Sequence, residues 1–168
     1  FGLFNIANIM AAMASAHALK VPIATIKAGI ETLSNIPGRS EVFFGPDGRR
    51  IVVDYAHTAD GLAEVLKALK STNPQKLTVI FGAGGNRDKG KRPEMGAVAE
   101  EYADKIWLTN DNPRDESPNK IVEDILSGIK NKNNITIELD RQQAIFNALR
   151  NSGPEETVLV AGKGHETY

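Results

Sequence analysis

The stretch LTVIFGAGGNRDKGKRPEMGAVAEEYA, residues 77–103, decides the fold class of this chain. It passes from an apolar run at 77–81 through a glycine-rich, basic loop into a helical pattern at about 93–103. A short apolar run bounded by glycine is typical of a buried strand, and a strand, a loop and a helix in succession form the repeating unit of a parallel sheet. The stretch therefore predicts an α/β fold.

The same alternation of strand and helix patterns continues on both sides of this stretch. Further strands are predicted at 41–44, 51–54, 106–109, 135–139 and 157–161, and further helices at 59–71, 119–130 and 142–150. This order predicts a Rossmann-like, mainly parallel sheet with helices on both faces. The first two strands are joined through Gly45, Pro46, Asp47 and Gly48, which predicts an antiparallel hairpin.

Two amphipathic helices are predicted before the sheet, from Asn5 to Lys20 and from Ile23 to Leu33, because apolar residues recur there at helical spacing. Pro22 closes the first helix, and the pair Pro37 and Gly38 closes the second. The composition changes at this point, so we expect a domain boundary near Pro37.

Composition and charge exclude several classes of protein. The 168 residues, 41% apolar and 24% charged, suit one globular domain with a short extension. The 20 basic and 21 acidic residues give a net charge of -1, which argues against general attraction to nucleic acid or membrane. Without cysteine there are no disulfides, and no apolar run reaches the roughly 20 residues that span a bilayer. We expect a cytoplasmic monomer, and, because Phe1 is not preceded by methionine, a segment of a longer protein.

Polar segments follow four of the predicted strands. They occupy residues 54–60, 82–92, 110–114 and 162–166. In an open α/β sheet the ligand crevice lies beyond the carboxyl ends of the strands. The four segments therefore predict one site at one edge of the sheet.

The loop 82–92 has the composition of an anion site. Glycines let backbone N–H groups approach a phosphate or carboxylate, and the basic residues and the start of the next helix add positive potential. Its spacing matches neither a P-loop nor a dinucleotide-binding fingerprint. The alternative is an ordinary glycine-rich surface turn.

The segment after residue 53 suits a nucleotide. Asp54 could accept hydrogen bonds from ribose hydroxyls, and Tyr55 and His57 offer flat faces or donors. The alternative for Asp54 is a cap on the next helix, although Thr58 and Asp60 stand closer to the helix start. The three histidines lack the spacing of a zinc site, and we assign His17, among apolar neighbours, a structural role.

The two remaining segments suit an amino acid. The Arg114 guanidinium could pair bidentately with a carboxylate, and Asp111 and Glu166 could receive an ammonium. A molecule with two carboxylates and two amines would use the whole array. The alternative for Arg114 is an ion pair with Asp115 or Glu116.

Five motifs in this order resemble the Mur ligase family. They are Phe4-Asn5-Ile6-Ala7-Asn8, Gly38-Arg39-Ser40-Glu41, the segment 54–60, the segment 84–93 together with Asp111-Asn112-Pro113-Arg114, and Gly162-Lys163-Gly164-His165-Glu166. The resemblance covers essentially the whole chain. One departure is Ala59, where the family usually has proline.

The resemblance implies roles for individual residues. The positions implied for binding meso-diaminopimelate are Arg87, Asp111, Asn112, Pro113, Arg114, Gly162 and Glu166. The positions implied near ATP are Asn5, Arg39, Asp54 and His57. No catalytic residue and no metal ligand is implied within the chain.

The resemblance also implies a reaction. It is the ATP- and Mg²⁺-dependent addition of meso-diaminopimelate to UDP-MurNAc-L-Ala-D-Glu in peptidoglycan precursor synthesis. Residues 1–37 would be the helical end of the family's central domain, and 38–168 its carboxy-terminal domain, truncated at the end. The family's phosphate loop and magnesium ligands would lie upstream, so we expect this segment to supply the amino-acid site and part of the ATP site and to be inactive alone. A lysine-adding type, a related Mur or folylpolyglutamate-type ligase, and a non-catalytic binding module stay open as alternatives.

Overall fold

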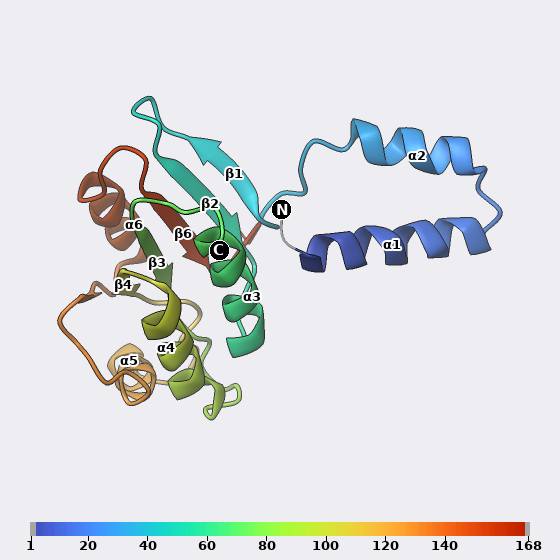
Figure 1. Cartoon of the computed structure of the whole chain (residues 1–168). Coiled ribbons are helices and arrows are strands. Elements are labelled where there is room, and N and C mark those ends of the chain that lie inside the picture. Colours follow the sequence, from blue (N-terminus) through green and yellow to red (C-terminus); the bar gives the residue numbers. More distant parts are fainter. Residues whose placement is uncertain (1–2, 167–168) are drawn as a thin grey trace. The chain divides into compact units, whose positions relative to one another are not determined.

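The chain forms two compact units, Phe1–Ile36 and Pro37–Tyr168. A computed structural model describes the backbone of residues 3–166 and the side chains of residues 5–166. The first unit consists of α1 (Leu3–Ala18) and α2 (Ile23–Thr32), joined by a short turn in which Lys20 has a φ of 60° (Figure 1). Both predicted helices are confirmed, with ends that agree within two residues. No helix among residues 3–166 is long and apolar enough to cross a membrane.

The second unit contains a six-stranded sheet with the order β1-β2-β6-β3-β4-β5. The strands are β1 (Glu41–Phe44), β2 (Arg50–Asp54), β3 (Leu77–Phe81), β4 (Lys105–Leu108), β5 (Ile135–Ile137) and β6 (Thr157–Ala161). The β1 strand is antiparallel to β2, and the other neighbouring strands are parallel. The predicted hairpin and the mainly parallel sheet are thus confirmed. The last strand of the sequence lies inside the sheet, between β2 and β3.

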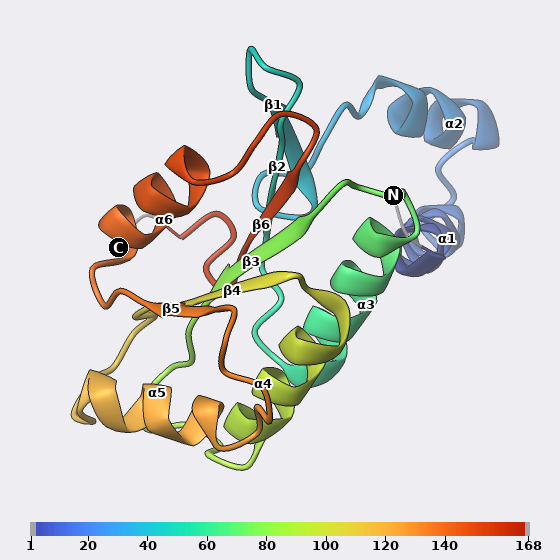
Figure 2. The same ribbon diagram turned by 60° about the vertical axis from the view of Figure 1, so that its left-hand side comes forward.

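Helices cover both faces of this sheet, as predicted. The helices α3 (Ala59–Lys70), α4 (Lys91–Tyr102) and α5 (Pro118–Leu126) lie on one side, and α6 (Arg141–Arg150) lies on the other (Figure 2). Leu62, Leu66 and Leu69 of α3 are fully buried because they recur at helical spacing on the inner face. On the other face, Ala144 and Ala148 of α6 pack in one cluster with apolar side chains of the strands.

One helix ends earlier than its pattern predicts. The α5 helix ends at Leu126, whereas the sequence predicts a helix to Lys130. The amides of Lys130 and Asn131 donate to the Glu100 carboxylate of α4 instead of continuing the helix. At Gly128 the chain passes so close to α4 that a Cβ would lie 1.8 Å from the Pro93 carbonyl oxygen. Tertiary contacts therefore override the helical pattern.

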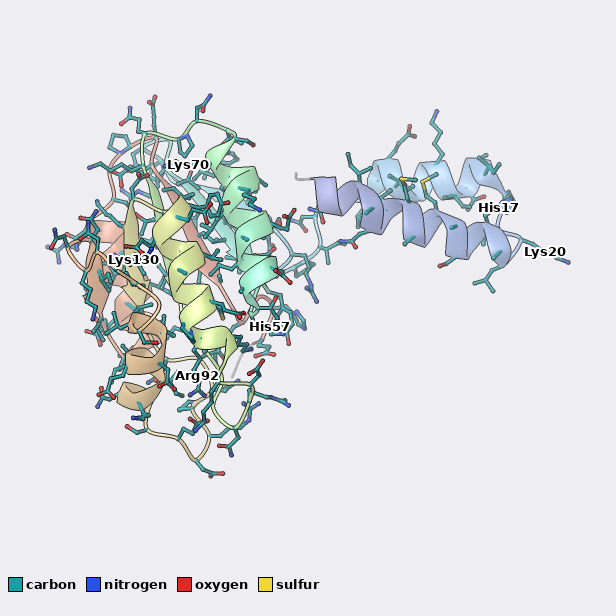
Figure 3. All side chains as sticks on the ribbon, turned by 60° about the horizontal axis from the view of Figure 1, so that its bottom comes forward. His17, Lys20, His57, Lys70, Arg92 and Lys130 are labelled. Atoms are coloured by element: carbon teal, nitrogen blue, oxygen red, sulfur yellow. The ribbon has the colours of Figure 1, made fainter. Side chains whose placement is uncertain are left out.

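The strand register aligns the carboxyl ends of four strands. Asp54 pairs with Ala161, Ile80 pairs with Val160, and Phe81 pairs with Leu108. The polar segments that follow these strands consequently start at the same edge of the sheet. Figure 3 shows His57 and Arg92 at this end of the unit and Lys70 at the opposite end.

Candidate functional site

A crevice of about 470 Å³ lies beyond the aligned strand ends. Such a volume is in the usual range for small-molecule sites. Its walls come from all four predicted segments, including Lys91 at the start of α4. The lining residues are Tyr55, His57, Gly82, Ala83, Gly84, Arg87, Lys91, Asp111, Asn112, Arg114, Gly162 and Glu166.

Most of the residues singled out in the sequence meet in this crevice. Seven of them line it: His57, Arg87, Asp111, Asn112, Arg114, Gly162 and Glu166. Arg39, Asp54 and Pro113 belong to the same unit but do not line the crevice, and Asn5 lies on α1 of the first unit. Tyr55 and Lys91 line it as well, although neither is among the residues that the family resemblance implies.

Glycines in the loop 82–92 allow two loops to pack against each other. A Cβ on Gly82 would lie 2.1 Å from the Thr109 carbonyl oxygen, and one on Gly85 would lie 1.8 Å from that of Pro113. The Gly85 N–H donates to the Asn112 carbonyl at 2.8 Å. The interpretation of this glycine as an amide offered to an anion is therefore wrong, because its donor is already used.

The side chains of Arg87 and Arg114 both lie beside Gly84. A Cβ at Gly84 would lie 3.1 Å from Nη1 of Arg114 and 3.6 Å from Cγ of Arg87. Arg114 has a φ of 50°, which is uncommon for a residue other than glycine. Its Nη1 donates to the Gly85 carbonyl at 2.6 Å. Within the part of the chain that the structure describes, Arg114 forms no ion pair with Asp115 or Glu116, so that alternative is not realised.

A buried ion cluster joins the same two loops. Arg92 is fully buried, and its guanidinium donates to both Glu116 carboxylate oxygens at 2.9 Å and to Asp124 at 2.8 Å. Glu116 also accepts from the Asn86 N–H at 2.6 Å. The Arg92 hydrogen bonds, followed by the Asn86 N–H, lower the pKa of Glu116 to about 2. Arg92 is therefore not one of the loop's anion-facing cations, contrary to the interpretation from composition.

The carboxyl ends of β4 and β6 are held together by Arg141. Its guanidinium donates to the Asn110 carbonyl at 3.2 Å and to the Ala161 carbonyl at 2.8 Å. These two residues immediately precede Asp111 and Gly162. Gly162 has a φ of 110°, and a Cβ there would lie 2.8 Å from Oδ2 of Asp111. Sequence reasoning missed Arg141, since its position at the start of α6 gives no sign of contacts 20 and 31 residues away.

Lys91 adds a cation to the wall beside His57. Its Nζ donates to the His57 carbonyl at 2.8 Å. Burial lowers the pKa of Lys91, while the Asp111 carboxylate acts in the opposite direction. The sequence offered a signal here, because Lys91 stands at the end of the basic loop and begins a helix that points its amino terminus at the site.

Asp54 organises the loop that carries Tyr55 and His57. Its Oδ2 accepts from the Ser40 N–H at 2.7 Å and from the Ser40 hydroxyl at 3.0 Å, and its Oδ1 accepts from the Ala56 N–H at 2.7 Å. The helix cap is Thr58, whose hydroxyl accepts from the Gly61 N–H, as the sequence favoured. The carboxylate thus fixes the entry to β1 beside the end of β2.

Tyr55 is surrounded by three side chains. The Arg39 guanidinium lies 4.5 Å from its ring centroid, and the His57 and His165 rings lie at 4.9 and 5.8 Å. Its hydroxyl donates to Oε1 of Glu166 at 3.0 Å. Among the side chains of residues 5–166, no group of three or more His, Asp or Glu residues is arranged to hold a metal ion.

The family model described as Mur ligase, glutamate ligase domain, matches residues 38–164. The chain belongs to the Mur ligase family. The match covers the sheet, the first three loops of the crevice and the start of the fourth, up to Gly164.

Individual Mur ligases are similar over nearly all of the chain. The UDP-N-acetylmuramoyl-L-alanyl-D-glutamate–2,6-diaminopimelate ligases of Coxiella burnetii and Thermosynechococcus vestitus are 47% and 44% identical over 99% of it. A solved structure of a ligase with the same name is 39% identical over the whole chain, with a TM-score of 0.75. The UDP-N-acetylmuramate-alanine ligase of Thermotoga maritima, at 21% identity and a TM-score of 0.70, shares the fold. The chain spans 34% of the length of these curated relatives.

Proposed function

We propose that this chain is the carboxy-terminal part of an ATP-dependent ligase that adds meso-diaminopimelate to UDP-MurNAc-L-Ala-D-Glu. The observation that carries the proposal is the joint presence of two arginines and two carboxylates in one crevice. The 47% identity to a diaminopimelate ligase supports it. Residues 1–37 would be the helical end of the central domain, and 38–168 the carboxy-terminal domain.

The crevice offers both signs of charge to a diamino diacid. Arg87 and Arg114, whose side chains both lie beside Gly84, would receive carboxylates, with Arg114 held by the Gly85 carbonyl. Asp111 and Glu166, on neighbouring loops, would receive ammonium groups. Close contacts between loops shape this surface. The loop 110–114 touches the loop 82–92 through Asn112 and Pro113, and it touches the loop after β6 at Gly162.

The other end of the crevice would face ATP. We assign Arg39, Asp54 and His57 to the nucleotide side, with Asp54 acting through the loop that it fixes. We also assign Asn5, on α1 of the first unit, to ATP binding. In the proposed reaction, the γ-phosphoryl group of ATP passes to the D-Glu carboxylate. The amine of diaminopimelate then attacks the acyl phosphate, an amide forms and phosphate leaves. Cations and N–H donors stabilise the charge that builds up on the oxygens.

This segment supplies one part of that machinery. Magnesium and the phosphate loop would belong to the rest of the ligase, so the 168-residue chain by itself should form no amide from ATP, diaminopimelate and the nucleotide precursor. We further propose that the complete ligase is a cytoplasmic monomer.

The test is Arg114→Ala in the complete ligase. A hydrogen bond to a charged group is worth about 1.5–3 kcal/mol, so kcat/KM for diaminopimelate should fall roughly tenfold to hundredfold while the KM for ATP stays nearly unchanged. Lysine, which lacks the second carboxylate, should gain relative to diaminopimelate. Arg150→Ala at the far end of α6 is the matched control. An unchanged ratio of the two amino acids would remove the reason for assigning diaminopimelate.

A further inference from the structure

Tyr55 connects the nucleotide side of the crevice to the amino-acid side. It directly follows Asp54 at the end of β2 and lines the crevice. Its hydroxyl donates to Oε1 of Glu166, which stands 111 residues later in the sequence. The sequence suggested a flat face for a nucleotide, whereas the structure shows a hydroxyl that reaches a carboxylate of the amino-acid side.

The ring of Tyr55 is held in place by its surroundings. The Arg39 guanidinium lies over the ring, His165 is stacked with it at an interplanar angle of 29°, and His57 meets it edge-on at 70°. A Cβ on Gly164 would lie 3.0 Å from Cβ and Cδ2 of Tyr55, so the glycine lets the loop after β6 pass close to the ring. Such contacts leave the ring little freedom to change its rotamer.

Glu166 stands in the loop after β6, whose backbone packs against Gly38: a Cβ on that glycine would lie 2.2 Å from the His165 amide nitrogen. The loop contains Gly162 and Gly164, both with positive φ, and turns through a hydrogen bond from the Glu166 N–H to the Lys163 carbonyl. A glutamate side chain has three rotatable bonds, and a binding group must be held near its productive geometry by neighbouring hydrogen bonds. The fixed Tyr55 hydroxyl supplies one such bond.

We propose that Tyr55 is a positioning residue that orients the Glu166 carboxylate toward an ammonium group of the incoming diamino acid. The inference rests on the proposed function, because it takes Glu166 as the acceptor of that ammonium. Oε1 accepts the phenol, and the second oxygen of the carboxylate is thereby aimed at the substrate. Tyr55 acts through Glu166 and takes part in no bond-making step.

Tyr55→Phe in the complete ligase tests this inference, since it removes the hydroxyl and keeps the ring. The KM for diaminopimelate should rise about three- to tenfold, as expected for losing one hydrogen bond to a partly exposed charged group. The KM for ATP and the midpoint of thermal unfolding should stay close to those of the unmodified enzyme. Tyr102→Phe controls for the loss of a tyrosine hydroxyl, because Tyr102 is the last residue of α4, whereas the first residue, Lys91, lines the crevice.

A double-mutant comparison with Glu166→Gln separates the inference from the proposed function. If Tyr55 acts through Glu166, the double variant should bind diaminopimelate no more weakly than Glu166→Gln alone, because the two effects are not additive. If Glu166→Gln raises the KM but Tyr55→Phe does not, or if the two effects add fully, the inference alone is overturned. If Glu166→Gln leaves the KM unchanged, the assignment of Glu166 in the proposed function fails, and the inference fails with it.

Discussion

Replacing Arg92 by methionine tests whether the buried ion cluster holds the two crevice loops together. The change keeps an unbranched side chain in a fully buried position and removes four hydrogen bonds, three to carboxylates and one to the Gly84 carbonyl. Glu116 and Asp124 would then lose their shared cation. Breaking a buried ion pair on one side costs about 3–5 kcal/mol, but these two carboxylates keep 13% and 29% exposure, so we expect roughly 2–3 kcal/mol.

Urea and thermal unfolding of the chain at pH 7 measure this loss. For a domain of this size, the expected loss corresponds to a fall in Tm of roughly 6–12 °C. Lys120→Met, which removes an exposed ion pair with Glu123 on α5, is the control and should change stability by less than about 0.5 kcal/mol. Changing Glu116 to Gln and Asp124 to Asn in the Arg92→Met background should restore part of the stability. A loss below about 1 kcal/mol for Arg92→Met would refute the idea that the cluster joins the loops.

Three further outcomes are expected. The pKa of Glu116 is lowered from 4.5 to about 2 in the folded state, so its carboxylate stabilises the fold above about pH 4.5, and this stabilisation is lost as the pH falls toward 2. The Tm should therefore fall across this window, and it should fall less in Glu116→Gln. Gly85→Ala should separate the loops, because its Cβ would lie 1.8 Å from the Pro113 carbonyl oxygen, and should cost roughly 1–3 kcal/mol in urea unfolding. Thr58→Ala removes the cap of α3 and should cost about 1 kcal/mol in the same assay, whereas an unchanged midpoint would show that the cap is dispensable.

The sequence predicted the elements and the place of the site because both depend on local patterns. Alternating apolar runs and helical spacing define the strands and helices, and the rule that ligands bind at strand carboxyl ends brings the polar segments together. The partners of the buried charges were not predictable in this way. Arg92 stands in a basic loop where exposure is the usual expectation, and only the packing of α5 against α4 brings Asp124 to it.

The same limit applies to Asp54 and Arg141. Asp54 was expected to face a nucleotide, yet its acceptors are occupied by the Ser40 and Ala56 donors, of which Ser40 is contributed by a turn 14 residues away. Arg141 reaches the ends of β4 and β6 only because α6 crosses back over the opposite face of the sheet. Contacts of this kind follow from the topology, which a single sequence does not display.

The central place of β6 has a consequence for how the molecule is made. On the ribosome, β2 and β3 leave the exit tunnel long before residues 157–161 are synthesised. They belong to separate groups of strands until β6 pairs with both of them. Nascent chains that stop short of Ala161 hold two separate groups of strands with open edges, which are prone to pair with other chains. Because this closure joins residues about 80 and 107 positions apart, folding should be slow, and the crevice should form in its last step.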